Sequence, residues 1–312
     1  MQVTKWNGKP ISKPGWYSGI PIEVYHGPGI CDGLAVSSSN LRTCWTKSPA
    51  HMFAEWAENP NRKEKEMTEA MLVGACAHFL LLGEDGFRTK YIPYPPEYPD
   101  KKTGVLKPWH MGADFCKVWA EKQIKGGRTP VTDKVLDSII EMAKSLRREA
   151  LVNEGMLRGY VEVSGFWKDQ ETGLWLKTRP DVVPMDGPEF VDLKTTKEVT
   201  TVSLMSTIRN FGYHMQGALV GEVCDGLMQP FDSFTMLFVE TSNPWCARAV
   251  QMPAIDLGRG REMNRLMIRQ IKDCIEQNRF PGPGEGELIE IGLSNDERAR
   301  IDAVLKRTEK AA

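Results

Sequence analysis

The chain has 312 residues, of which 41% are hydrophobic and 26% are charged, and its formal net charge is −1. These values are typical of a globular protein that is long enough to bury a core in one or two domains. The near-zero charge excludes histone-like binding of nucleic acid over the whole surface, but it leaves room for a local basic groove.

Targeting and metal-binding signals are sparse along the chain. No run of about 18 apolar residues predicts a membrane span, and residues 1–14 lack the apolar stretch of a signal peptide. The seven cysteines are scattered, with no CxxC pair. This favours reduced, buried thiols over a zinc or iron–sulfur site, and we expect a cytoplasmic protein.

The N-terminal half is predicted to be helical after an irregular start. Glycine and proline recur through residues 1–35, which predicts an irregular N-terminal arm. Ser37 to Asn40 supply N-cap side chains for a helix that runs toward Trp56. Further helices, with a proline-rich loop after the first of them, are expected at residues 67–82, 111–123 and 133–149.

The pattern changes after Gly159, where alternation with the period of a strand begins. A β-meander is predicted at residues 160–168, 174–183 and 189–195. A helix at 202–224, strands at 233–240 and 246–252, and a helix at 257–278 follow. This order predicts one α/β domain over residues 36–285, with a mixed central sheet flanked by helices, followed by a charged helix or tail at 286–312.

Charged residues gather on the second and third strands of the predicted meander. Asp192 and Lys194 are two residues apart, so they point to the same face. Asp181 shares a face with Arg179 and Lys177, and it meets Asp192 if the two strands pair. Two carboxylates and an ammonium suit hydrolysis of a phosphodiester assisted by magnesium. Spacing alone favours a charged pair on an exposed strand over such a site.

The wider string around these residues resembles a known motif. Residues 177–181 read Lys-Thr-Arg-Pro-Asp, and Val-Asp-Leu-Lys follows at 191–194. This resembles the PD-(D/E)XK nuclease superfamily, and more narrowly the RecE-type exonucleases (exonuclease VIII), a RecB-like branch of phages and prophages. Matching context lies at residues 37–41, 48–51, 74–78, 162–167 and 213–216, within a resemblance that spans residues 20–281.

The resemblance implies a PD-(D/E)XK core and a set of site residues. Lys194 would be catalytic, with Glu162 supporting the metal or its water. The metal ligands would be His78, Asp181, Asp192 and the backbone carbonyl of Leu193. Contacts to DNA or to the lysine would come from Gln216, Tyr213, Thr195, Arg179 and Ser39. One or two Mg²⁺ ions are implied, with Mn²⁺ able to substitute.

One position departs from the family pattern, and several residues have a second interpretation. The family often has a tyrosine four residues after the helical glutamine, whereas this chain has Val220, so Tyr213 is a candidate substitute. Without the resemblance, the apolar neighbours of His78 favour a core histidine, and Glu162 is equally compatible with an exposed strand residue. Tyr213 and Gln216 are also compatible with a simple interhelical hydrogen-bond pair.

The function that the resemblance implies is degradation of the 5′-ended strand from duplex DNA ends, leaving a 3′ single strand for phage-type recombination in a bacterial host cell. Its partners would be a single-strand annealing protein and further copies of the chain in a ring. Two alternatives stay open, a restriction or junction-resolving endonuclease of the same superfamily and a fold relative that binds DNA without cutting it.

Overall fold

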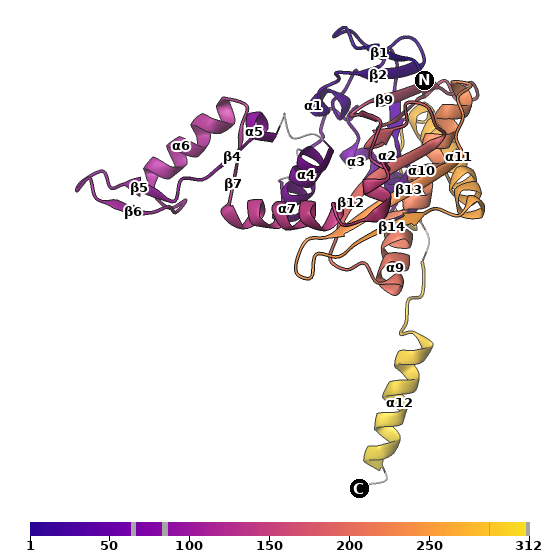
Figure 1. Ribbon diagram of the computed structural model, residues 1–312. Helices are drawn as coiled ribbons and strands as arrows, with labels where there is room; N and C mark the ends of the chain where they lie inside the picture. Colours follow the sequence, from indigo (N-terminus) through magenta and orange to yellow (C-terminus); the bar gives the residue numbers. More distant parts are fainter. Residues whose placement is uncertain (64–66, 83–86, 287, 310–312) are drawn as a thin grey trace.

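The computed structural model describes residues 1–63, 67–82, 87–286 and 288–309 (Figure 1). The helices in this part of the chain are α1 (Ile22–Tyr25), α2 (Ser38–Thr46), α3 (Pro49–Glu55), α4 (Glu69–Leu82), α5 (Phe87–Lys90), α6 (Asp114–Lys125), α7 (Asp133–Leu146), α8 (Ala150–Asn153), α9 (Thr201–Phe211), α10 (Tyr213–Gly226), α11 (Ala254–Glu276) and α12 (Asn295–Glu309). The strands are β1 (Val3–Lys5), β2 (Gly15–Ser18), β3 (Ala35–Ser37), β4 (Tyr91–Pro93), β5 (Glu97–Pro99), β6 (Leu106–Pro108), β7 (Thr129–Val131), β8 (Tyr160–Val161), β9 (Ser164–Lys168), β10 (Trp175–Thr178), β11 (Val182–Val183), β12 (Glu189–Thr196), β13 (Ser233–Glu240) and β14 (Ala247–Gln251).

The central sheet has five strands in the order β14-β13-β12-β11-β8. Only β12 and β13 pair in parallel, so the sheet is mixed. Phe190 and Phe234 pack on one face against residues of α10 and α11. Leu193 and Leu237 pack on the other face against residues of α4 and α7. Because both faces are covered, β13 is continuously apolar from Met236 to Val239. The predicted α/β fold with a mixed sheet flanked by helices is confirmed.

The predicted β-meander is wrong in one respect, because its first two strands are each divided between two sheets. β9 and β10 belong to a second sheet, of order β1-β2-β9-β10-β3, whereas β8 and β11 belong to the central one. The first break falls at Glu162, which adopts a left-handed φ of 56°. The second falls at Pro180, which has no N–H to donate to a ladder. The two breaks place Glu162 and Asp181 in the passage between the sheets.

Residues 1–35 were predicted to form an irregular arm, but they contain the strands β1 and β2 and the short helix α1 between irregular stretches. β1 and β2 pair with each other, and β2 pairs antiparallel with β9. Trp16 on β2 is 1% exposed and stacks on Phe190 of the central sheet at 5.8 Å between ring centroids. The partner strand lies about 150 residues away in sequence, so local composition does not reveal the pairing. The division into an arm, a nuclease domain and a C-terminal segment stays a prediction.

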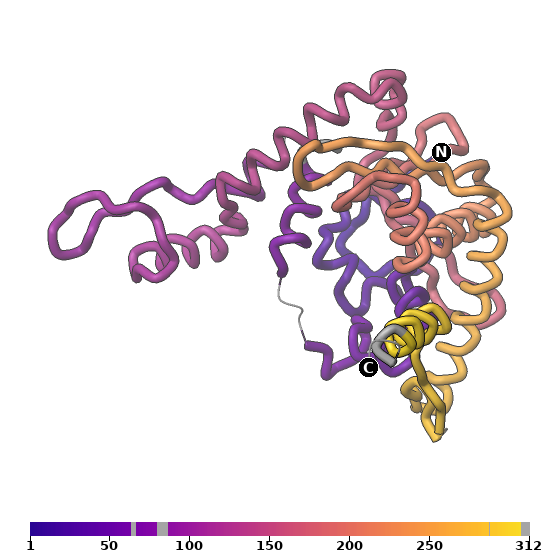
Figure 2. The backbone as a smooth tube through the Cα atoms, turned by 90° about the horizontal axis from the view of Figure 1, so that it is seen from below, coloured from indigo at the N-terminus to yellow at the C-terminus, as the bar shows by residue number. Residues whose placement is uncertain are grey.

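Residues 91–131 form an extension that stands out from the body of the protein, as both views of the backbone show (Figures 1 and 2). Its base is the parallel pair β4 and β7, and its outer part holds the β5–β6 hairpin and α6. Trp109 lies 5.2 Å from Trp119 and 5.8 Å from Tyr94 between ring centroids. The extension therefore has a small aromatic core of its own.

The C-terminal helix α12 also stands away from the body (Figure 1). It lies within residues 286–312, for which a charged helix or tail was predicted. No helix in the described ranges is long and apolar enough to cross a membrane.

The helix predicted at residues 202–224 is interrupted at Gly212. This residue has φ 61° and ψ 38°, and it ends α9 and precedes α10. Only glycine adopts this left-handed conformation without a steric cost. The break redirects the chain, so that α10 begins with Tyr213 beside β12.

Replacing Gly212 with alanine is expected to lower the free energy of unfolding by about 1–2 kcal/mol, the cost of a left-handed residue with a Cβ. The added Cβ would also lie 3.2 Å from Arg42 Cγ. Urea unfolding measures the effect. The matched control is Gly258→Ala on α11, where a Cβ meets nothing within 4 Å; it should be neutral or slightly stabilising. A Gly212→Ala variant as stable as the wild type would contradict this account of the break.

Candidate active site

Asp181, Asp192 and Lys194 meet beside the centre of β12. Lys194 Nζ forms an ion pair with Asp192 Oδ2, as expected for two side chains on one face of a strand. Asp192 is 1% exposed. Asp181 comes from the connection between β10 and β11, and its Oδ2 accepts a 2.7 Å hydrogen bond from the N–H of Leu193. The backbone of β12 thus holds the second carboxylate directly beside the first.

Lys177 does not accompany Asp181, so the face predicted to be shared by Lys177, Arg179 and Asp181 is wrong for the lysine. Lys177 is 4% exposed, and its Nζ donates a 2.7 Å hydrogen bond to the carbonyl of Tyr25. Arg179 donates to the carbonyl of Ile20 at 2.9 Å and lies 3.6 Å from Glu162 Oε2. The chain changes sheets between Thr178 and Asp181, which separates Lys177 from Asp181, whereas Arg179 and Asp181 line the same cavity.

Burial lowers the pKa of the Lys177 ammonium to about 8. The folded protein therefore releases this proton above pH 8, whereas the unfolded chain holds it until about pH 10.5. Stability rises with pH wherever the unfolded state binds more protons. Relative to Lys177→Met, the wild type should gain roughly 1–3 kcal/mol between pH 7.5 and 10.5. Urea unfolding of both proteins across this range measures the gain, and parallel pH profiles would contradict it.

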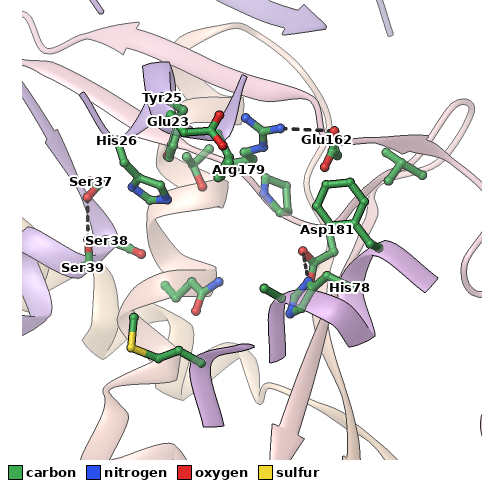
Figure 3. A pocket seen from close by; sticks show the side chains of 18 of the residues that line it. Glu23, Tyr25, His26, Ser37, Ser38, Ser39, His78, Glu162, Arg179 and Asp181 are labelled. Carbon is green, nitrogen blue, oxygen red and sulfur yellow. Dashed lines mark hydrogen bonds and ion pairs between the residues drawn. The ribbon is translucent and has the colours of Figure 1, made fainter. Parts of the chain in front are cut away.

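His78 on α4 is a partner of Asp181 rather than a histidine of the apolar core. Its Nδ1 lies 2.8 Å from Asp181 Oδ1, and its side chain is 32% exposed (Figure 3). Burial alone would lower the pKa of His78, but the charge and hydrogen bond of Asp181 outweigh it and raise that pKa. Because the carboxylate accepts from Nδ1, the lone pair of Nε2 is the one that a metal ion would use.

The first turn of α10 brings two side chains to β12. Gln216 Nε2 donates a 3.1 Å hydrogen bond to Asp192 Oδ1. The ring of Tyr213, three residues earlier on the same helix face, has its centroid 5.5 Å from Lys194 Nζ. Each of the two contacts a different member of the site instead of forming a hydrogen-bond pair of their own. Val220 is 1% exposed and belongs to the core, so the departure from the family pattern lies among apolar side chains.

A cavity of about 900 Å³ opens beside this cluster. Figure 3 shows Ser39 and its neighbours on one side, with His78 and Asp181 on the other. Of the predicted site residues, those that line it are Ser39, His78, Glu162, Arg179, Asp181 and Gln216. Thr195 instead lies beneath α4, since a Cβ added to Gly74 would meet its Oγ1 at 3.5 Å. Arg42 on α2 also lines the cavity, and no motif singled it out.

Two buried carboxylates dominate the electrostatics of the cluster. Burial raises the pKa of Asp192. Burial also acts to raise the pKa of Asp181, but the charge of His78, its hydrogen bond, Lys194 and the Leu193 N–H together lower it. Asp192 and Asp181 likewise raise the pKa of Lys194 against the opposing effect of burial. His78 and Lys194 therefore supply the positive charge that these carboxylates require.

The donor set fits a divalent cation in its chemistry. Carboxylate and carbonyl oxygens are the ligands of Mg²⁺ and Mn²⁺, and imidazole is common to many metal sites. In the arrangement seen here, no three His, Cys, Asp or Glu side chains of the described ranges are grouped closely enough to hold a metal ion. A bound cation would supply the positive charge that Lys194 now contributes to Asp192.

Residues 37–290 match the model of a family described as a PDDEXK-like domain of unknown function (DUF3799). The chain belongs to this family. The match covers most of the chain, so the predicted PD-(D/E)XK superfamily is confirmed. The nucleases of this superfamily generally use divalent metal ions.

One solved structure agrees with this assignment at the level of the fold. A protein from Eubacterium rectale that is provisionally named an exonuclease superposes with a TM-score of 0.54 and 15% identity, over 83% of this chain and 91% of that one. A phage-related exonuclease from Haemophilus somnus 129PT covers 65% of this chain and 94% of its own, at 14% identity and a TM-score of 0.28. No curated protein matches the chain.

Proposed function

We propose that this PDDEXK-like protein is a metal-dependent exodeoxyribonuclease that hydrolyses phosphodiester bonds from the ends of duplex DNA. The observation that carries the proposal is the meeting of Asp181, Asp192 and Lys194 beside a cavity of about 900 Å³. The polarity, 5′ to 3′ with a 3′ single strand as product, is taken from the RecE-type resemblance.

The proposed cofactor is Mg²⁺, as one or two ions, with Mn²⁺ as a substitute. Its ligands would be His78, Asp181, Asp192 and the carbonyl of Leu193. When bound, such an ion neutralises charge on the scissile phosphate and lowers the pKa of a bound water.

The chain's own residues would orient the reaction. Lys194 would hold the attacking water and stabilise the negative charge that develops on the phosphoryl oxygens. The water oxygen bonds to phosphorus, the bond from phosphorus to the leaving sugar oxygen breaks, and that oxygen takes up a proton. Gln216 would keep Asp192 in place through its 3.1 Å hydrogen bond. Glu162, whose side chain is 58% exposed, would act from the cavity wall on the metal or its water.

Contacts to the DNA strand are proposed for two further residues of the cavity wall. Ser39 and Arg179 line the cavity, and both side chains can donate hydrogen bonds to phosphate oxygens. Tyr213 would help to hold Lys194, and Thr195 would act from the end of β12.

A comparison of plasmid topologies tests the proposal. The protein is incubated with Mg²⁺ and either covalently closed plasmid or the same plasmid after linearisation. We expect the linear form to be degraded and the closed form to survive, with no cleavage when a chelator replaces the metal. Cutting of the closed form would indicate an endonuclease, and binding of linear DNA without cleavage would indicate a non-catalytic relative.

By the same resemblance we propose that copies of the chain assemble into a ring around the duplex. A single-strand annealing protein would receive the 3′ strand in a bacterial host cell.

A further inference from the structure

Arg42 lies on α2 and lines the cavity, outside every motif that the sequence reveals. We propose that Arg42 is a positioning residue that fixes Lys194 through the ring of Tyr213. The proposal rests on the proposed nuclease function, in which Lys194 is the catalytic ammonium.

The guanidinium of Arg42 is fixed at two points of the backbone. Its Nε donates to the carbonyl of Ser38 at 3.2 Å, one turn earlier on α2. Its Nη1 donates to the carbonyl of Phe211 at 2.8 Å, at the end of α9. The rigid, planar guanidinium thereby joins α2 to the point where α9 gives way to α10.

The close approach of Arg42 depends on Gly212. A Cβ at this position would lie 3.2 Å from Arg42 Cγ and 3.3 Å from Cδ, so the stem of the arginine occupies the space that other residues would fill. The left-handed glycine and the arginine together determine where α10 begins. Tyr213 is the first residue of that helix.

The ring of Tyr213 lies within cation–π distance of both cations. Its centroid is 5.7 Å from Arg42 Cζ and 5.5 Å from Lys194 Nζ. Phe211 stacks on the same ring at 5.6 Å, and Phe238 of β13 lies 6.1 Å away. A ring held in this way restricts the positions open to the lysine, whose flexible stem would otherwise lower its effective concentration at the reacting phosphate.

Two other roles for Arg42 make different predictions. An arginine that binds DNA directly would change KM, because the free energy of substrate binding would change. An arginine that only joins two helices would change the unfolding temperature and leave kcat of the folded protein unaltered. An arginine that acts through Tyr213 changes kcat, and its effect disappears when Tyr213 has already been removed.

The test is a double-mutant cycle on the full chain, with linear duplex DNA and Mg²⁺. Arg42→Met should lower kcat about tenfold with KM within about twofold, since small misplacements of a catalytic group are costly. In a Tyr213→Leu background, the same change should cost less than about twofold. Arg42→Lys, which keeps a cation near the ring, should recover part of the loss. Arg259→Met on the exposed surface of α11 is the matched control and should behave as the wild type.

Three results would each overturn the proposal. The kcat losses of Arg42→Met and Tyr213→Leu could simply multiply in the double variant, Arg42→Met could change KM alone, or it could be as fast as the wild type. Should Arg42→Met fail to fold, the cycle is run with Arg42→Lys, whose smaller loss must also vanish beside Tyr213→Leu. A wild type without metal-dependent cleavage would refute the nuclease function itself. An active wild type with an additive cycle refutes only the role of Arg42.

Discussion

Replacing Lys194 with alanine is expected to lower the rate of DNA cleavage by about 10²–10³-fold, the usual cost of removing one group that stabilises transition-state charge. The ammonium is the cation of the candidate site that would face a developing oxyanion, and it already lies against Asp192. Binding of DNA ends should largely survive, because phosphate contacts elsewhere supply most of the affinity. Rates are measured on end-labelled linear duplex with Mg²⁺, and end binding is measured with Ca²⁺ in place of Mg²⁺.

The control for this substitution is Lys197→Ala, an exposed lysine three residues further along the chain. It should leave both rate and binding unchanged. If Lys194→Ala cleaves DNA as fast as the wild type, Lys194 is not a catalytic residue. A variant that loses binding and cleavage together would assign the lysine to substrate affinity instead.

The second large effect is expected for Asp192→Asn, which preserves shape and removes a charge that would bind the metal. Cleavage should fall by roughly 10³-fold or more, because the metal that lowers the pKa of a bound water and neutralises charge on the phosphate would be lost. The loss of metal binding should also be measurable without any substrate. A metal that binds only the folded state stabilises it by about 2.7 kcal/mol at a free concentration of 100 Kd.

Thermal unfolding with and without Mg²⁺ therefore separates metal binding from catalysis. The wild type should gain stability on addition of Mg²⁺, whereas Asp192→Asn should gain none. Asp186→Asn, at an exposed turn before β12, is the matched control and should respond as the wild type does. A full metal response in Asp192→Asn would show that the ion binds elsewhere.

Period-two alternation was sufficient to predict the contact between Asp192 and Lys194, because it depends only on the geometry of one strand. The helices and the strands of the central sheet were also predictable from apolar periodicity and turn residues. The position of Asp181 was only partly predictable. It reaches β12 from an irregular connection at Pro180, where the chain passes from one sheet to the other, and not from the face of a paired strand.

The N-terminal strands were not predictable from local sequence. β2 is short and begins with a glycine, and it is stabilised by β9 and by the stacking of Trp16 on Phe190. Such pairing depends on contacts between segments that are distant in the chain. The break at Gly212 was also not predictable, because an isolated glycine inside a helical pattern does not by itself indicate a break. The role of Arg42 was not predictable either, because the carbonyl of Phe211 that it contacts is distant in the sequence.

The release of nucleotides from an end-labelled linear duplex, with and without Mg²⁺, tests the central claim most directly. The account predicts metal-dependent release by the wild type, and none by Asp192→Asn or in the presence of a chelator. A wild type that binds the duplex but releases nothing with Mg²⁺ or Mn²⁺ would contradict it.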